Sequence, residues 1–132
     1  MFNFCLGQDL ASHRWKHRVI LLFAPETDHP TLLKQLALLT KHANEVTDRD
    51  LVFYQILPSA GLTPAAKLLS SEQAQKLYRK YSVSYDQFTF LLIGKDGTEK
   101  LRRQTLVPLP ELFALIDGMP MRRAEMKRKN KP

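Results

Sequence analysis

Residues 18–25 read Arg-Val-Ile-Leu-Leu-Phe-Ala-Pro, and this run decides the class of fold. The run is apolar after its first residue, it has the length of a strand, and Pro25 ends it. A short continuous apolar run predicts a strand that is buried on both faces, as in a parallel sheet. We therefore expect an α/β fold with helices on both faces of the sheet.

A helix and a second strand follow this run. Apolar residues recur every three or four positions from Thr31 to Val46, which predicts an amphipathic helix. Asp28 or His29 is its expected N-cap, with Pro30 in the first turn. Leu51–Leu57 is another continuous apolar run and predicts a second buried strand. Because a helix joins the two strands, they should be parallel with a right-handed crossover.

The next segment contains a loop, a second helix and a hairpin. Residues 58–69 are expected to form a loop, after which Ser70 or Ser71 caps a helix, with Gln73 placed for a capping box with Ser70. Two strand-like runs, Phe88–Ile93 and Glu99–Arg103, flank a turn that contains Asp-Gly. This pattern predicts an antiparallel β-hairpin.

A last helix opens at Pro110 and ends at Gly118. The predicted order is therefore β-α-β-α-β-β-α, with a four-stranded mixed sheet and helices on both faces. We expect a single domain over residues 1–121, followed by a basic, flexible tail over residues 122–132.

The positive charge is concentrated in that tail. The 132 residues carry a net charge of +7, and residues 119–132 hold six basic side chains and one acidic side chain, which gives +5. A basic tail suits a polyanion or a nucleic acid, so binding of such a partner is one alternative function. Nucleic acid is disfavoured because the aromatic residues lie in apolar runs, away from the basic residues, and form no stacking platform.

A second basic group involves the predicted hairpin. Arg102 and Arg103 lie on its second strand, and with Arg122 and Arg123 they are candidates for binding an anion. The alternative is that the charges on the strand protect a sheet edge from aggregation.

The single cysteine, Cys5, excludes an internal disulfide and zinc sites built on several cysteines. We expect it to be a small buried apolar side chain. No apolar run approaches the length of a membrane span, and the first residues lack the features of a signal peptide. The expected location is the cytoplasm. The alternative is an exported protein whose signal has been removed.

Several stretches resemble known families. Residues 88–97 are similar to a strand and turn of thioredoxins and peroxiredoxins. Residues 15–25, 92–97 and 112–123 resemble the P-DUDES family, a thioredoxin-like bacterial domain of unknown function that recurs in vertebrate secreted proteins of the Equarin and URB type. The most specific part is Met119-Pro-Met-Arg-Arg123, which either packs the last helix or docks a partner. The resemblance implies a thioredoxin-like fold and adds no activity.

The residues at the thioredoxin active-site position do not support thiol chemistry. Thioredoxins place Cys-Gly-Pro-Cys at the start of the first long helix, where the helix N-terminus favours the thiolate. The matching positions here are Thr27-Asp-His-Pro30, which contain no sulfur, and the peroxiredoxin cysteine is missing from the same region. We therefore expect neither thiol–disulfide exchange nor peroxide reduction, and the sequence indicates no cofactor.

The preferred hypothesis is a redox-inactive binding or scaffold module for a protein or peptide. Its expected binding residues form two segments, Glu26, Thr27, Asp28, His29 and Tyr85, Asp86, Gln87, Phe88. One alternative is an enzyme without thiol chemistry that uses Asp28 and His29 of the loop Glu26–Pro30 as acid and base. Another is that the loop only caps the helix. Glu26, Asp28 and His29 are a weak set of metal ligands, so no metal is expected. The sequence leaves the oligomeric state open.

Three further histidines, His13, His17 and His42, lie among basic or polar neighbours. We expect all three on the solvated surface.

Overall fold

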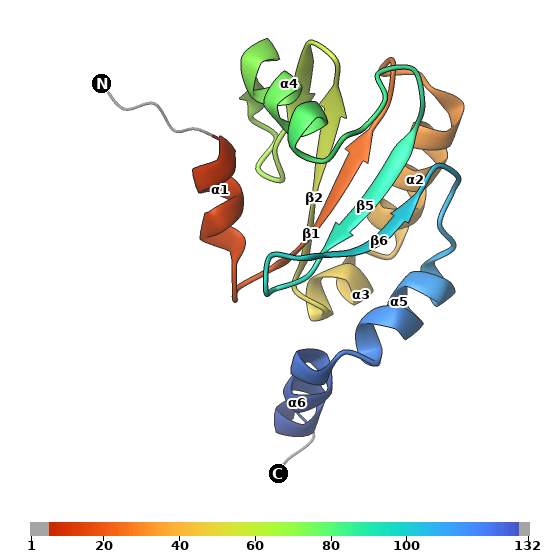
Figure 1. The fold of residues 1–132 in the computed structure, drawn as a ribbon. Coiled ribbons are helices and arrows are strands. Elements are labelled where there is room, and N and C mark those ends of the chain that lie inside the picture. Colours follow the sequence, from red (N-terminus) through yellow and green to blue (C-terminus); the bar gives the residue numbers. More distant parts are fainter. Residues whose placement is uncertain (1–5, 130–132) are drawn as a thin grey trace.

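The computed structural model describes residues 6–129, and a mixed sheet forms its centre (Figure 1). β1 (Arg18–Phe23) pairs parallel with β2 (Leu51–Leu57) and antiparallel with β5 (Thr89–Ile93). β6 (Glu99–Arg103) continues the sheet beyond β5. Every residue of β1 and β5 is buried, which explains why their sequences are apolar without alternation. The parallel pair and the hairpin are confirmed.

The sheet has six strands, in the order β4-β3-β2-β1-β5-β6, and not the four predicted. The segment predicted as a loop adds β3 (Ala60–Leu62) and β4 (Leu68–Leu69) beside β2. Strands of three and two residues are too short to show alternation in the sequence. Gly61 is required in β3, because a Cβ there would lie 2.5 Å from the carbonyl oxygen of Gln55 on β2.

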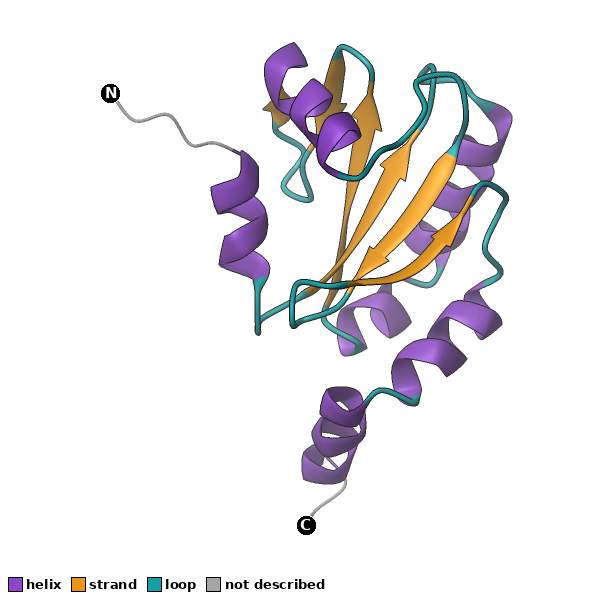
Figure 2. Cartoon of the chain, in the orientation of Figure 1, coloured by secondary structure: helices purple, strands orange, loops and turns teal. Residues whose placement is uncertain are grey.

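Helices cover both faces of the sheet, as predicted (Figure 2). α2 (Pro30–Lys41), α3 (Ala43–Asp48) and α5 (Leu109–Asp117) contribute to the core on one face. α1 (Leu6–His13) and α4 (Ser71–Lys80) contribute to the core on the other. The side chains of β1 alternate between these two cores, with Ile20 and Leu22 in the first and Val19, Leu21 and Phe23 in the second.

The helices differ from the prediction in three places. The single helix expected over residues 31–46 is two helices, α2 and α3, separated at His42. α1 was not predicted. Residues 122–129, expected to be part of a flexible tail, belong to α6 (Pro120–Lys129). α6 is too polar to show an apolar stripe, yet its Arg122 and Glu125 are buried. Cys5, which was expected to be buried, lies outside the described residues. Residues 130–132, the end of the predicted tail, also lie outside them.

None of the helices within residues 6–129 combines the length and the apolar character needed to cross a membrane.

The capping box at the start of α4 is confirmed and gives a first testable prediction. The Ser70 hydroxyl accepts a hydrogen bond from the Gln73 backbone N–H at 3.1 Å, and the Gln73 side chain accepts one from the Ser70 N–H at 3.0 Å. Ser70→Ala should lower the free energy of unfolding by about 1 kcal/mol, because the N–H of Gln73 loses its acceptor. Urea unfolding measures the effect. Ser71→Ala, one position into the helix, is the control and should leave stability nearly unchanged.

Candidate functional site

The loop that follows β1 carries the first half of the predicted binding face. Glu26, Thr27 and Asp28 are exposed, and α2 begins at Pro30 with His29 as its N-cap. The His29 side chain makes no capping hydrogen bond. Its ring instead stacks on Phe88, with centroids 6.1 Å apart and an interplanar angle of 14°. His29 therefore contacts the second predicted segment and does not act as a side-chain cap.

The second half of that face lies just before β5. The two loops meet because Phe23, at the end of β1, pairs with Thr89, at the start of β5. Phe88 is buried, whereas Tyr85 keeps 48% of its surface exposed and lies with its ring 4.6 Å from that of Tyr78. Asp86 accepts a hydrogen bond from Ser84, and Asp86 and Gln87 are both exposed. The structure thus brings together the residues that the sequence placed in two distant segments.

Buried groups beneath this face do not supply an evident acid or base. The Tyr78 hydroxyl donates toward the carbonyl oxygens of Ala24 at 3.2 Å and Ile56 at 3.3 Å. Burial, with a smaller effect of Tyr85, raises the pKa of Tyr78 far above its ordinary value, so it stays neutral. The Nδ1 atom of His29 is buried without a hydrogen-bond partner among the described residues. Within residues 6–129 there is no group of three or more potential metal ligands.

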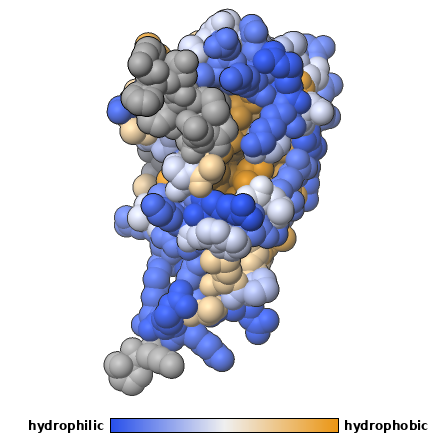
Figure 3. Space-filling view, turned by 60° about the vertical axis from the view of Figure 1, so that its left-hand side comes forward, coloured by the Kyte–Doolittle hydropathy of each residue, from blue (hydrophilic) through white to orange (hydrophobic). Residues whose placement is uncertain are grey.

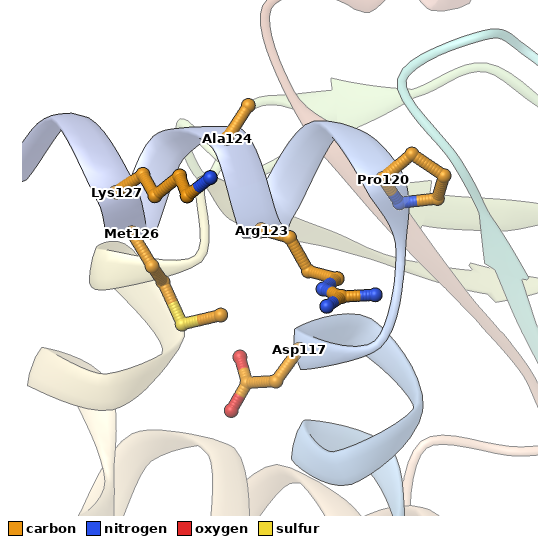
Figure 4. A pocket seen from close by; sticks show the side chains of 6 residues that line it. All are labelled: Asp117, Pro120, Arg123, Ala124, Met126 and Lys127. Carbon is orange, nitrogen blue, oxygen red and sulfur yellow. The ribbon is translucent and has the colours of Figure 1, made fainter.

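The four arginines predicted to bind an anion have different environments. Arg102 forms an ion pair with Glu99 and donates to the Tyr81 carbonyl oxygen at 2.6 Å. Arg103 forms an ion pair with Glu111. Arg122 is buried in the network described next. Arg123 borders a cavity of about 710 Å³, where its guanidinium, the Asp117 carboxylate and the Met126 side chain lie between α5 and α6 (Figure 4).

A buried ionic network joins α6 to the sheet, and sequence analysis missed it. Arg18, the first residue of β1, donates to both carboxylate oxygens of Glu125 at 3.2 and 3.3 Å and to the Arg49 carbonyl oxygen at 2.8 Å. Lys95 donates to the same carboxylate at 2.7 Å and to Asp50 at 2.8 Å. The Arg18, Lys95 and Glu125 side chains are only 1%, 7% and 9% exposed. Glu125 is therefore the carboxylate that two buried cations share.

A second part of the network surrounds Arg122. Its guanidinium pairs with Asp48 at 2.7 Å and with Asp117 at 3.0 Å. Arg49 binds Asp117 from the other side at 2.8 Å, and Lys129 binds Asp48 at 2.7 Å. Arg122 and Glu125 lie three positions apart and so share one face of α6. That spacing is a local signal that the basic segment packs against the domain.

These contacts predict how acid weakens the attachment of α6. Hydrogen bonds from Lys129 and then Arg122 lower the pKa of Asp48 from 3.8 to about 2. A lowered pKa contributes stability above the unfolded value, and this contribution is lost as the pH falls from about 4 to about 2. Asp48→Asn should therefore reduce the urea midpoint at pH 6, and its midpoint should approach that of the wild type near pH 2. A difference that does not change between pH 6 and pH 2 would contradict this.

Two of the histidines that were expected on the solvated surface, His13 and His17, form contacts within the protein instead. The Nδ1 atoms of His13 and His17 lie 3.0 Å apart, and His13 Nε2 lies 2.8 Å from the Tyr54 hydroxyl. Both histidines are half-buried. This contact ties the end of α1 to β2.

A further cavity, of about 520 Å³, lies at the start of β1, at the other end of that strand from the Glu26–Pro30 loop. Trp15, Met119 and Met121 are among the residues that line it. The segment Met119–Arg123 therefore has two roles: Arg122 is a buried ion-pair partner, and the two methionines border a cavity.

The strand order and the helices on both faces define a thioredoxin-like fold, and solved structures confirm it. The reduced 2-Cys peroxiredoxin of Plasmodium vivax is similar with a TM-score of 0.67 and 16% identity, over 87% of this chain and 72% of that one. The mitochondrial 2-Cys peroxiredoxin of Plasmodium falciparum gives 0.64 and 15%, over 93% and 84%. At these identities the likeness establishes the fold alone.

The family follows from the sequence match. The family model described as a domain of unknown function, DUF4174, matches residues 9–125, and the chain belongs to this family. The chain is also 27% identical over 137 residues to coiled-coil domain-containing protein 80 of Danio rerio. That match covers 89% of this chain and 15% of the zebrafish protein, so the chain spans only a small part of that relative's length.

Proposed function

We propose that this chain is a binding module of thioredoxin-like fold that works without thiol chemistry. It engages a peptide segment of a partner protein through the face formed by residues 26–29 and 85–88. One observation carries the proposal: the position that holds cysteines in thioredoxins holds a histidine stacked on Phe88, beside an exposed Tyr85. An exposed tyrosine held against the Tyr78 ring suits an interface anchor, because it offers a large contact area at a low entropic cost.

The two alternatives have less support. For the enzyme without thiol chemistry, the cavities of 710 and 520 Å³ are both lined by residues outside the loop Glu26–Pro30. For a polyanion binder, three of the four candidate arginines already pair with carboxylates, Arg102 with Glu99, Arg103 with Glu111, and Arg122 with Asp48 and Asp117. A steep loss of heparin binding as salt is raised would nevertheless favour the polyanion binder. The narrower assignment to the P-DUDES family belongs to the same proposal and is supported by the segment Met119–Arg123.

Site-specific photocrosslinking tests the binding face. A photoreactive phenylalanine analogue at position 85 should give discrete adducts in cells that naturally contain this protein. The same analogue at position 33, where Leu33 is 49% exposed on α2, is the matched control and should not give those adducts. Adding His29→Ala should reduce the adducts formed from position 85, because the ring that packs on Phe88 is removed. Equal adducts from both positions would contradict the proposed face.

The absence of thiol chemistry has its own test. Insulin-reduction and peroxide-consumption assays should show no activity, and Cys5→Ser should change neither result. An activity that disappears in Cys5→Ser would overturn this part of the proposal.

A further inference from the structure

The 520 Å³ cavity at the start of β1 is separate from the proposed binding face and has a distinctive composition. Its apolar wall comes from three places, Trp15 before β1, Leu115 on α5, and Met119 and Met121 around the start of α6. Its size falls within the range of small-molecule sites in proteins, about 300–1,000 Å³. The cavity can therefore hold a compact ligand.

Exposed apolar side chains gather around this cavity. Trp15 is 57% exposed, Leu115 39% and Met121 38%, and these are three of the six large apolar residues that are exposed within the described part of the chain. Trp15 has a positive φ of 70°. Its backbone N–H donates to the Lys95 carbonyl oxygen at 2.7 Å, and this bond fixes the backbone that carries the indole. Figure 3 shows, toward the end of the molecule that carries α6, a hydrophobic area beside a band of hydrophilic side chains. Exposed apolar surface that is concentrated in one place indicates a binding site.

The charged groups of the lining are mostly cationic. Arg18, Lys95 and Lys100 line the cavity together with one carboxylate, Asp96, which pairs with Lys100 at 2.9 Å. Glu125 and Asp50, the carboxylates that bind Arg18 and Lys95, are not part of the lining. The lining therefore holds three cations and one carboxylate, and the carboxylates that pair with Arg18 and Lys95 lie outside it.

Two of these cations retain hydrogen-bonding capacity. The buried Nε of Arg18 has no acceptor among the described residues. The Lys95 ammonium has three N–H donors, and the described residues give it two carboxylate acceptors, Asp50 and Glu125. A single anionic group on a ligand would accept the remaining Lys95 N–H, whereas the Arg18 Nε lies too deep to be reached from the cavity. A multiply charged phosphate would find too few free donors and a predominantly apolar wall.

We propose that this cavity binds a small amphipathic carboxylate, a molecule with one carboxylate group and an apolar body of about eight to ten carbons. The carboxylate lies toward Lys95 and Lys100, and the apolar body lies against Trp15, Leu115 and the two methionines. Methionine side chains suit this role because they adapt to ligands of different shape.

Trp15 makes the proposal directly measurable, since it is the only tryptophan in the chain. Titration with decanoate below its micelle concentration should change the Trp15 fluorescence in a saturable manner and raise the melting temperature. Decanol and decylamine, which have the same apolar body, should bind at least tenfold more weakly. In the series hexanoate, octanoate, decanoate, each added CH₂ group should tighten binding about threefold to fourfold. Decanol or decylamine binding as tightly as decanoate would overturn the proposal, as would no saturable response to decanoate.

Two variants locate the site while keeping the reporter. Met121→Glu should weaken decanoate binding at least tenfold, because it places a carboxylate in the apolar wall. Leu33→Glu, at an apolar position on α2 that is 49% exposed against 38% for Met121, is the matched control and should bind like the wild type. Lys100→Gln should weaken binding of decanoate and leave that of decanol unchanged. Unaltered decanoate binding by Met121→Glu, in a variant that melts at the same temperature as the Leu33→Glu control, would show that the cavity is not the site.

Discussion

Replacing Glu125 by alanine is expected to lower the free energy of unfolding by about 3–5 kcal/mol, because it leaves two buried cations without their shared carboxylate. Arg18 and Lys95 are 1% and 7% exposed at their side chains, and both donate to Glu125 at 2.7–3.3 Å. Lys95 keeps its ion pair with Asp50, whose side chain is 45% exposed. The substitution therefore destabilises Arg18 more than Lys95. An unpaired buried guanidinium has no low-energy alternative, since arginine does not deprotonate in proteins.

The chain offers a matched control for this prediction. Glu111 also forms an ion pair with an arginine, Arg103, but the two side chains are 44% and 41% exposed. Glu111→Ala should therefore cost less than about 1 kcal/mol. Urea unfolding of both variants at neutral pH makes the comparison. Equal losses of stability would show that the Glu125 network contributes no more than a surface ion pair.

The pH dependence of the Glu125 contribution follows from its surroundings. Burial acts to raise the pKa of Glu125, but hydrogen bonds from Lys95 and Arg18 outweigh burial, and the net effect lowers the pKa below its ordinary 4.5. The stabilisation is therefore complete above pH 4.5 and is lost as the pH falls through the lowered value. The difference between wild type and Glu125→Ala should consequently shrink in acid.

Gln35→Leu is expected to destabilise the protein by about 2–6 kcal/mol, because it leaves two buried backbone groups unpaired at about 1–3 kcal/mol each. Gln35 is fully buried on α2. Its Nε2 donates to the Val107 carbonyl oxygen at 3.0 Å, and its Oε1 accepts from the Val107 N–H at 2.8 Å. Leucine has a similar size but offers Val107 neither a donor nor an acceptor.

Two measurements test the role of Gln35. Urea unfolding gives the loss of stability, and hydrogen exchange at the Val107 amide reports the local bond. Lys34→Leu, the neighbouring exposed position, is the control and should change stability by less than about 0.5 kcal/mol. Unchanged protection of the Val107 amide in Gln35→Leu would contradict the assignment, because that amide should then have another acceptor.

Local sequence patterns were sufficient to predict those parts of the structure that depend on neighbouring residues in the sequence. The apolar runs of β1 and β5, the Asp-Gly hairpin turn and the Ser70–Gln73 capping box are all confirmed, because each depends on residues only a few positions apart. The break at His42 and the short strands β3 and β4 were missed. They depend on how short segments fit against elements that are already packed.

The candidate site also has a part that the sequence predicted and a part that it did not. The two loops were predicted to form one binding face. The contact of His29 with Phe88 agrees with that pairing. The basic segment was misjudged, because its composition shows only six cations and one acid and gives no sign that Arg122 and Glu125 are buried. A polar helix docks here through ion pairs, which leave no apolar periodicity to detect.

The sequence by itself determined the order of the main elements, the parallel pairing of the first two strands, the hairpin and the missing sulfur at the helix start, because these follow from local periodicity and residue identity. Only the tertiary structure decided that α6 belongs to the folded domain and that a cavity forms beneath Trp15. Both features depend on partners far apart in the chain, such as Arg18 and Glu125, which are separated by 107 positions. The desolvation that makes such a pair important exists only after the chain has folded.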